Sequence, residues 1–488
     1  MTTTTSGPPA AVRSVSPQAT VRLLGAWHTT GPAYAALADA LRSAVLAGSL
    51  PVLTRLPSER ELARALGVSR ATTSAAYARL RDLGFATSRV GSGTVAALPR
   101  DASRHEVAAP PPAGDAPASD TPSADPTTPA TDDTIDMSQA TPSASRALHG
   151  AYTRALEALP AYLDGGGYAH LGVEPLRAAV AARYTARGVP TDPDQILVTT
   201  GAQQAIALLA TTLVARTEHV VVESPTYVHA LEAMRRTGAR VVGVPVGDVE
   251  AIESVVRRTG ARFVYLVPDF HNPTGRSLSA DERRALADLV ARHDVTVVGD
   301  ETLTDVDLVG AGVPAPVVGD GTDPRLVAVG SASKSFWGGL RVGWVRADPQ
   351  LVRRLAHTRQ VLDVATPVLE QLAVTDLLEH RAAILPDRLA ALRAQRDDLV
   401  DLLHERLPAW DVPRPDGGLC LWVGVGRPVG RALAAAAVTE GLRVSPGPLF
   451  TPDGSGQDRV RLTYTRPAGQ YEPVVDRLRR AWERVGGR

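Results

Sequence analysis

Lysine is almost absent from this chain. Among its 52 lysine and arginine residues only one is a lysine, Lys334. A genome that favours arginine codons would account for the arginines but not for this exception. A guanidinium group stays protonated and is a poor nucleophile, whereas an amine with a lowered pKa attacks an aldehyde. The sole lysine therefore marks a candidate position for Schiff-base chemistry.

Two further scarcities limit what the protein can be. Its single cysteine, Cys420, excludes an intramolecular disulfide and cysteine-rich zinc sites, so we expect no metal centre and a reducing compartment. No apolar run approaches the roughly 18 residues that would cross a bilayer, and the first residues lack the basic and apolar regions of a signal peptide. We expect a cytoplasmic protein without a membrane partner.

The net charge of zero conceals an uneven distribution. The first 99 residues contain ten arginines and four acidic residues, a net charge of +6, so the remainder carries −6. A basic N-terminal part is typical of a domain that binds a polyanion. Residues 98–135 are rich in Pro, Ala, Thr and Asp and poor in large apolar side chains. This composition predicts a flexible linker between two folded parts.

The basic part contains three helical patterns followed by a hairpin. Residues 33–46 have apolar side chains at helical spacing, and Ser58 with Glu61 forms a capping box at the start of a second helix. A third helix follows after a tight glycine turn, and residues 85–96 read as two short strands around Gly-Ser-Gly. This order predicts a winged helix-turn-helix domain over residues 20–97.

The longer part alternates strand-like runs with amphipathic helical segments. Most of these runs are apolar throughout, which predicts a largely parallel seven-stranded sheet with helices on both faces. The last two runs are too close for a crossover helix, so the last strand should be antiparallel. Residues 356–488 predict a smaller α+β domain. The seven runs are residues 195–199, 219–222, 240–244, 263–267, 295–298, 326–329 and 340–344.

Small and polar residues follow these predicted strands, where open α/β sheets bind ligands. A helix start, serines and an arginine suit a phosphate; the other side chains suit an aromatic ring, a ring hydroxylate, a protonated ring nitrogen and an aldehyde. Pyridoxal phosphate combines these features. Each residue alone has an ordinary explanation, such as a helix cap or a core aromatic, but their order favours the cofactor. They are Gly201, Ala202, Gln203, Tyr227, Asn272, Asp300, Ser331, Ser333, Lys334 and Arg341.

In this order of motifs, residues 136–488 resemble the fold-type I aminotransferases. The resemblance implies that Lys334 forms the Schiff base and that Arg461 binds the α-carboxylate of a substrate or effector. The alternative for Arg461 is an ordinary charge at a strand edge. Tyr168 matches the family tyrosine that reaches the phosphate in the partner subunit's site, so a homodimer is implied.

Two positions depart from that family. Ala202 stands where a hydroxyl residue is common, and Thr302 stands where a tyrosine usually follows the aspartate. The loss of these donors predicts weaker contacts to the phosphate and to the ring oxygen. We expect the cofactor to bind, and we expect transamination to be inefficient.

The basic part carries the motifs Leu-Pro-Ser-Glu-Arg-Glu-Leu-Ala, Leu-Gly-Val-Ser-Arg-Ala-Thr and Gly-Ser-Gly-Thr, and it closely resembles the GntR family of winged-helix regulators. Side chains at the start of the recognition helix meet phosphates and base edges in such domains. Ser74 stands where some members read a base with arginine, so the operator sequence cannot be copied from them. The resemblance implies DNA contacts by Arg60, Ser69, Arg70, Thr72, Ser74, Arg89 and Gly91.

A GntR-type reader joined by a long linker to an aminotransferase-like domain is similar to the MocR subfamily of transcription regulators. The resemblance implies a homodimeric regulator that binds double-stranded DNA and senses pyridoxal phosphate, or an amino compound bound to it. The alternative is an active pyridoxal-phosphate-dependent aminotransferase that carries a DNA-binding domain. A second domain that only dimerises is a third possibility, which the position of the sole lysine disfavours.

Overall fold

The computed structural model divides into two compact units. The first contains the described residues up to Pro99 together with Arg146–Gly150, and the second contains the remainder from Thr134. Most of the expected linker lies outside the described residues. These are residues 14–25, 27, 32–46, 49–51, 54–89, 93–97, 99, 134–319 and 321–487.

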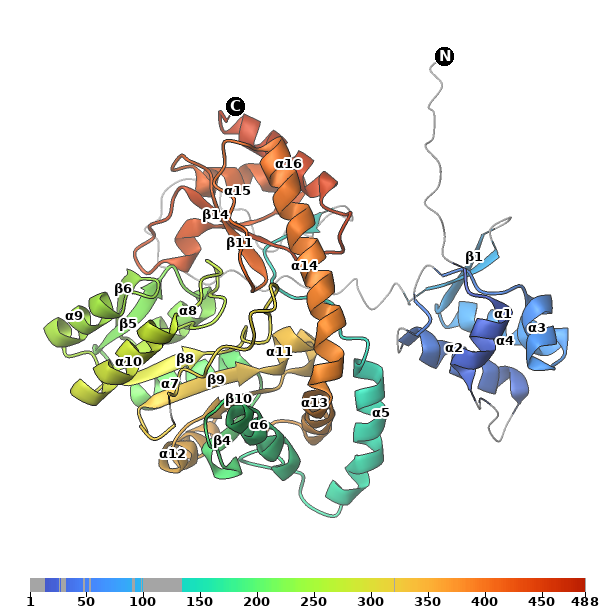
Figure 1. Cartoon of the computed structure of the whole chain (residues 1–488), viewed down its shortest axis with the longest axis horizontal. Coiled ribbons are helices and arrows are strands. Elements are labelled where there is room, and N and C mark those ends of the chain that lie inside the picture. Colours follow the sequence, from blue (N-terminus) through green and yellow to red (C-terminus); the bar gives the residue numbers. More distant parts are fainter. Residues whose placement is uncertain are drawn as a thin grey trace. The chain divides into compact units, whose positions relative to one another are not determined.

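The smaller unit is a helical domain with a two-stranded wing (Figure 1). Its core is formed by buried side chains that include Leu37, Leu62 and Tyr77. The expected winged helix-turn-helix is confirmed. Its elements are α1 (Pro17–Leu24), α2 (Ala33–Leu46), α3 (Glu59–Leu66), α4 (Arg70–Asp82), β1 (Ala86–Arg89) and β2 (Gly93–Ala96), and the two strands are antiparallel.

Local capping interactions set the helix boundaries in this unit. The Ser58 hydroxyl accepts from the Glu61 amide and the Glu61 carboxylate accepts from the Ser58 amide, so the predicted capping box is present. Gly67 ends α3 in the left-handed conformation, with φ of 69°. The Ser69 hydroxyl caps α4 by accepting from the Thr72 amide at 3.0 Å. The turn between α3 and α4 is therefore fixed by short-range contacts.

The larger unit is built on a seven-stranded sheet of order β4-β10-β9-β8-β7-β5-β6. β10 is antiparallel to both of its neighbours, and the other neighbouring strands are parallel. The expected sheet and its antiparallel last strand are confirmed. The strands are β4 (Ile196–Thr199), β5 (His219–Ser224), β6 (Arg240–Pro245), β7 (Phe263–Leu266), β8 (Thr296–Asp300), β9 (Leu326–Ser331) and β10 (Gly343–Arg346).

Helices cover both faces of this sheet (Figure 1). Residues of α7, α8 and α12 share one core with the strands. The last strand begins later than expected, at Gly343, because Gly338–Leu340 form a 3-10 turn. Before the strands of the sheet, the chain forms α5 (Leu148–Ala158), whose first three residues fall in the first unit. The helices of the larger unit are α6 (Glu174–Ala186), α7 (Ala202–Leu213), α8 (Val228–Arg236), α9 (Val249–Thr259), α10 (Ala280–Arg292), α11 (Ala332–Ser335), α12 (Pro349–Arg359) and α13 (Val368–Glu379).

The long helix α14 (Arg381–Arg406) runs from the large sheet to a smaller α+β part (Figure 1). In this part β11 pairs with β14, β14 pairs with β13, and α15 and α16 complete the core. β3 pairs in parallel with β12, so residues 135–136 also belong to the smaller part. The bounds are β3 (Ile135–Asp136), β11 (Cys420–Gly424), α15 (Gly430–Thr439), β12 (Leu442–Arg443), β13 (Ser445–Pro446), β14 (Arg459–Thr463) and α16 (Glu472–Arg484).

Within the described residues, no helix combines the length and the apolar character needed to span a membrane.

Candidate cofactor site and DNA interface

A candidate anion site lies where β4 ends and α7 begins. Gly201 has a φ of 82°, and a Cβ at this position would lie 2.5 Å from Nη2 of Arg341. Only glycine therefore lets the guanidinium group approach this turn. Arg341 donates to the Thr200 carbonyl at 3.2 Å. The first amides of α7, those of Ala202 and Gln203, follow Gly201 directly in the chain. A guanidinium group beside a helix N-terminus suits a phosphate.

Lys334 lies in α11, directly after β9. The Ser331 hydroxyl caps this helix by accepting from the Ser333 amide at 3.1 Å, and it also donates to the Ser333 hydroxyl. Nζ of Lys334 donates to the Ala140 carbonyl at 2.8 Å. Burial, together with the charge of Arg461, lowers the pKa of Lys334 to about 8. A minor fraction of the amine, larger than for an ordinary lysine, is therefore neutral near physiological pH and can act as a nucleophile.

Asp300 is the last residue of β8 and is almost completely buried. Its carboxylate accepts from the Tyr265 hydroxyl at 2.8 Å and from the Thr302 amide at 3.0 Å. Burial raises the pKa of Asp300, and these hydrogen bonds oppose the rise. A buried carboxylate with two fixed donors suits a cationic ring nitrogen. The sequence did not reveal Tyr265, because a tyrosine inside an apolar strand reads as core.

Asn272 and Arg461 meet across the two parts of the larger unit. Nη1 of Arg461 donates to Oδ1 of Asn272 at 3.3 Å, and Nη2 donates to the Ser138 carbonyl. The Phe450 ring lies 4.7 Å from the guanidinium carbon. Arg461 is 7% exposed, its Nε has no hydrogen-bond partner, and it forms no ion pair within the described residues. Burial lowers its pKa.

This environment bears on what Arg461 can bind. A buried guanidinium group that contacts only neutral acceptors keeps an uncompensated charge, which favours a carboxylate ligand. A strand-edge arginine of the ordinary kind would be solvated instead. The geometry therefore favours the anion-binding interpretation of Arg461.

Tyr227 precedes α8 and borders the same region. Its ring makes an edge contact with His229, with centroids 5.4 Å apart, and burial beside Asp300 raises its pKa to about 12. The Gln203 side chain donates to the His229 carbonyl at 3.1 Å and so connects α7 to α8. Burial and the charge of Arg461 lower the pKa of His229. No sequence pattern marks His229 as a site residue.

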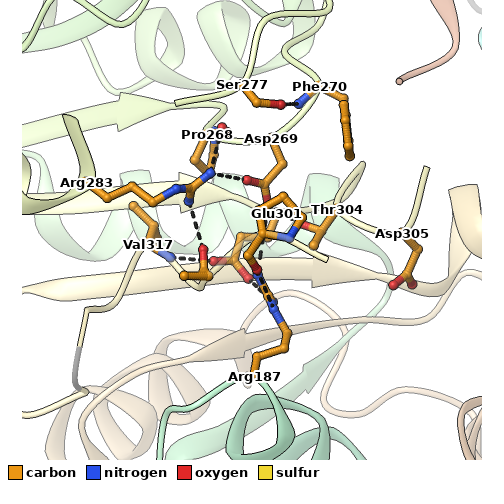
Figure 2. Close-up of polar contacts among 12 residues, drawn as sticks. Arg187, Pro268, Asp269, Phe270, Ser277, Arg283, Glu301, Thr304, Asp305 and Val317 are labelled. Carbon is orange, nitrogen blue, oxygen red and sulfur yellow. Dashed lines mark hydrogen bonds and ion pairs between the residues drawn. The ribbon is translucent and has the colours of Figure 1, made fainter. Parts of the chain in front are cut away.

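Buried ion pairs connect two of the strand-end loops behind the site (Figure 2). Arg187 lies 2.7 Å from Glu301, the residue after Asp300, and 3.9 Å from Asp269. Arg283 donates to Asp269 at 2.5 Å. Burial raises the pKa of Asp269, and Arg283 opposes this. The pairs therefore join the loop after β7, which contains Asp269 and Asn272, to the loop after β8, which contains Glu301.

A second buried pair supports the turn that carries the lysine. Asp305 accepts from Arg183 at 2.8 Å and from the Ser335 hydroxyl at 2.7 Å. The Arg183 guanidinium group also lies over the Trp344 ring, 5.8 Å from its centroid. α6 is thereby connected both to α11 and to β10.

Tyr168 is not brought to this site within its own chain. Its ring is 70% exposed and stacks on His170 with centroids 6.5 Å apart. Its expected contact in a partner subunit stays a prediction. Among the described residues, no group of three His, Cys, Asp or Glu side chains is arranged to hold a metal ion.

The candidate DNA contacts gather at the start of α4. Ser69 and Arg70 are exposed there, and Thr72 lies 2.8 Å from Ser69, hydroxyl to hydroxyl. Ser74 lies half-buried one turn later, and Arg60 is exposed near the start of α3. In the part of the chain that the structure describes, neither Arg60 nor Arg70 forms an ion pair. Their charges are available to a polyanion.

The expected wing contacts are only partly described. Arg89 closes β1, but its side chain lies outside the described residues, as does Gly91 entirely. Their roles stay predictions.

Two families match separate parts of the chain. The family described as "Aminotransferase class I and II" matches residues 148–478. The family described as "Bacterial regulatory proteins, gntR family" matches residues 33–95.

Individual relatives come from both kinds of protein. The 2-aminoadipate transaminase of Thermus thermophilus is 32% identical over 60% of this chain and 75% of its own length. YisV of Bacillus subtilis, named as an uncharacterised HTH-type transcriptional regulator, is 27% identical over 63% of this chain and 64% of its own.

A solved structure shares the fold of the larger unit. It is LysN, the α-aminoadipate aminotransferase of Thermus thermophilus complexed with N-(5'-phosphopyridoxyl)-L-leucine, at a TM-score of 0.65 and 26% identity. The match covers 73% of this chain and 92% of that one.

Proposed function

Since this chain belongs to the class I and II aminotransferase family and carries a gntR-family domain, we propose that it is a transcription regulator that binds pyridoxal phosphate. It responds to this cofactor, or to an amino compound bound to it, by changing its affinity for an operator. The observation that carries the proposal is the sole lysine, with a lowered pKa, in a chain that also has a winged-helix reader.

The donors of the larger unit fit this cofactor. When bound, pyridoxal phosphate supplies an aldehyde that condenses with amines and a ring that withdraws electrons. Arg341 and the first amides of α7 bind the phosphate. The hydroxyl groups of Ser331, at the end of β9, and of Ser333, in α11, are further phosphate ligands. Lys334 provides the amine. Asp300 holds a proton on the ring nitrogen by charge pairing.

The remaining site residues orient the ring and the effector. Tyr227 would offer its ring as a face for stacking, and the side-chain amide of Asn272, whose Oδ1 accepts from Arg461, would donate to the ring oxygen. Arg461 binds a carboxylate of the effector, because its buried charge has no acidic partner within the described residues. An amino acid therefore suits the site, because its carboxylate can pair with Arg461 and its amine can condense with the aldehyde of the cofactor.

We also propose that the protein acts as a homodimer. Several large apolar side chains of the larger unit are exposed in the single chain, and Tyr168 among them would reach the partner subunit's phosphate site. A contiguous group of such side chains would mark an interaction site. They are Leu156, Leu163, Tyr168, Val361 and Leu362. Two reader domains in one dimer would bind two operator half-sites.

In the reader, the exposed Arg60, Ser69 and Arg70 contact phosphates and base edges. Thr72 lies beside Ser69, and Ser74 lies one turn after Arg70 on the same face of α4. Arg89 and Gly91 extend the contact through the wing.

An active aminotransferase is the second candidate. The 32% identity to a transaminase favours it. Against it, Thr302 replaces the expected tyrosine, and its short side chain lies beside Asp300, where it lowers the pKa of that carboxylate. Ala202 likewise offers no side-chain donor to a phosphate.

Absorbance and DNA binding together test the proposal. Purified protein with pyridoxal phosphate should absorb in the visible range, and Lys334→Arg should lose this band because a guanidinium group does not condense with the aldehyde. A duplex selected from a random library by the parent protein serves as the operator. The cofactor should change the parent's affinity for this duplex and leave that of Lys334→Arg unchanged.

Two results would contradict the proposal. An unchanged spectrum in Lys334→Arg would remove the lysine assignment. DNA binding that ignores the cofactor, combined with half-transamination at about 1 per second or faster, would replace the regulator by the enzyme. Asp300→Asn is a further check, since it should weaken cofactor binding and shift the spectrum.

A further inference from the structure

Residues 138–145, here called the strap, lie between the two parts of the larger unit and contact three cationic side chains. In each contact a backbone carbonyl of the strap accepts a hydrogen bond from the cation. The pairs are Ser138 with Arg461, Ala140 with Lys334 at 2.8 Å, and Ser143 with Arg388 at 2.9 Å. One short segment thus contacts the two cations assigned to the ligands and a third one on α14.

These three cations have no carboxylate partner within 4 Å in the described part of the chain. Nε and Nη2 of Arg388 and Nε of Arg461 are buried without a hydrogen-bond partner. Burial lowers the pKa of Arg388 to about 10. A carbonyl dipole compensates a buried charge less well than an anion does. The contacts of the strap with Lys334 and Arg461 are therefore ones that a ligand can replace.

Both ends of the strap are anchored, each to a different part. Before it, the buried Met137 accepts at its carbonyl from the Thr463 amide and hydroxyl in the smaller part. At its other end, the Ser145 amide donates to the Phe336 carbonyl at 3.0 Å, two residues after Lys334. A change in the strap therefore alters the connection between the two parts. Upstream of β3, the chain continues through residues 100–133 to the reader.

Ligand chemistry acts directly on two of the three carbonyl contacts. When Lys334 condenses with an aldehyde, a C=N bond replaces the C=O bond, water leaves, and the nitrogen keeps at most one proton in place of three. The donor to the Ala140 carbonyl is then lost or redirected to the ligand. A carboxylate at Arg461 competes for the N–H groups that now contact Ser138 and Asn272.

We propose that the strap carries the signal from the ligand site to the DNA reader: ligands at Lys334 and Arg461 displace its carbonyls, and the strap loosens or moves. This inference rests on the proposed function, because it requires both a ligand at the site and a response in DNA binding. It adds the element that connects the two.

Hydrogen exchange of the full-length protein tests the displacement. Pyridoxal phosphate alone is the probe, and the amides of residues 138–145 are followed by mass spectrometry. Exchange of the strap should rise about threefold or more when the cofactor band has developed, whereas the buried strands β8 and β9 should not change. Unchanged exchange of the strap at full cofactor absorbance would overturn the inference.

Arg388→Gln tests the transmission without touching the proposed ligand residues. It removes one anchor of the strap, so the strap should exchange faster without cofactor, and operator affinity without cofactor should shift towards the cofactor-bound value of the parent. Arg393→Gln is the matched control, because Arg393 lies on the same helix and donates to the Leu308 carbonyl instead. Identical operator binding in both variants and the parent would contradict a role in transmission.

The two proposals fail in different ways. If the parent develops no cofactor band, the proposed function fails. If the band develops and operator affinity responds while the strap and Arg388→Gln behave like their controls, only the role of the strap is wrong.

Discussion

The larger unit contains two groups of buried cations that differ in what they contact. In the network behind the site each arginine meets a carboxylate, whereas at the site each cation meets backbone carbonyls. The network pairs are Arg183 with Asp305, Arg187 with Glu301 and Arg283 with Asp269. The second group is Lys334 and Arg461 at the site, with Arg388 on α14 bound to the same strap. We infer that the first group completes the fold and that, in the second, Lys334 and Arg461 leave charge for a ligand.

Electrostatics separates the two groups in the same way. Burial alone would lower the pKa of Arg187, but Glu301 reverses this and raises it. Burial lowers the pKa of Arg461 and Arg388: within the described residues no charge opposes it at Arg388, and at Arg461 the opposing effects of Cys420, Tyr227 and Asp136 do not reverse it. Burying a cation that no carboxylate of the protein neutralises costs stability. Such a cation is therefore a candidate for a role in ligand binding rather than in folding.

The largest expected effect is the loss of stability when an ion-paired arginine of the network behind the site is replaced. Arg187→Met leaves the Glu301 and Asp269 carboxylates buried beside one cation fewer, so the free energy of unfolding should fall by about 3–5 kcal/mol. Urea unfolding followed by tryptophan fluorescence measures this. Arg262→Met is the control: its pair with Asp294 is exposed, and its loss should cost at most about 1 kcal/mol. Equal losses in the two variants would remove the distinction.

The sequence predicted the fold well where the signal is local. Apolar runs gave the seven strands, and the Ser58 and Glu61 capping box gave the start of α3. The helix α1 was not anticipated, although Ser16 and Pro17 supply an N-cap and a first-position proline. Isolated caps are common, so this signal carries little weight without a long helical pattern after it.

The site was predictable as a set of residues but not as a set of contacts. Candidates at strand ends could be found because the ends of apolar runs are visible. The hydrogen bond between Arg461 and Asn272 joins residues 189 apart, and the one between Lys334 and Ala140 joins residues 194 apart. Neither the strap nor the network has a sequence pattern, because tertiary packing alone brings their members together.

The reader offers a third kind of cation, exposed and solvated, which sharpens the comparison. Arg70→Ala should leave stability within about 0.5 kcal/mol of the parent. It should weaken binding of the selected duplex about ten- to a hundredfold, a loss of roughly 1–3 kcal/mol. Fluorescence anisotropy at several salt concentrations measures this, with Arg22→Ala in the N-terminal helix α1 as the control. Arg70 is no DNA ligand if both variants bind like the parent.

A smaller effect should appear in the pH dependence of cofactor attachment. The pKa of Lys334 is lowered to about 8, so the neutral amine is a minor species at pH 7 and predominates at pH 9. The attachment rate should rise roughly fivefold from pH 7 to pH 8 and less than twofold from pH 8 to pH 9. Stopped-flow absorbance measures the rate. With an ordinary lysine pKa, the rate would instead rise about tenfold for each pH unit throughout this range.

The smallest expected change is in the stability of Arg461→Met, and it tests most directly whether the two groups of cations differ. Arg461→Met removes hydrogen bonds to Asn272 and Ser138, but it also removes an unneutralised buried charge. These opposing contributions are each of the order of a few kcal/mol, so the free energy of unfolding should change by no more than about 1 kcal/mol.

Arg346 provides the matched control for Arg461, since it is 1% exposed, donates to the Gly321 carbonyl and forms no ion pair in the described part of the chain. It lies at the end of β10 away from the candidate site, so a carbonyl-held arginine is not sufficient to make a ligand site. Arg346→Met should resemble Arg461→Met in stability. The two variants should differ in how the cofactor band responds to added L-amino acids: Arg346→Met should keep this response, and Arg461→Met should lose it. A loss of about 3 kcal/mol or more in Arg461→Met would place Arg461 with the ion-paired network, as a residue that the fold needs.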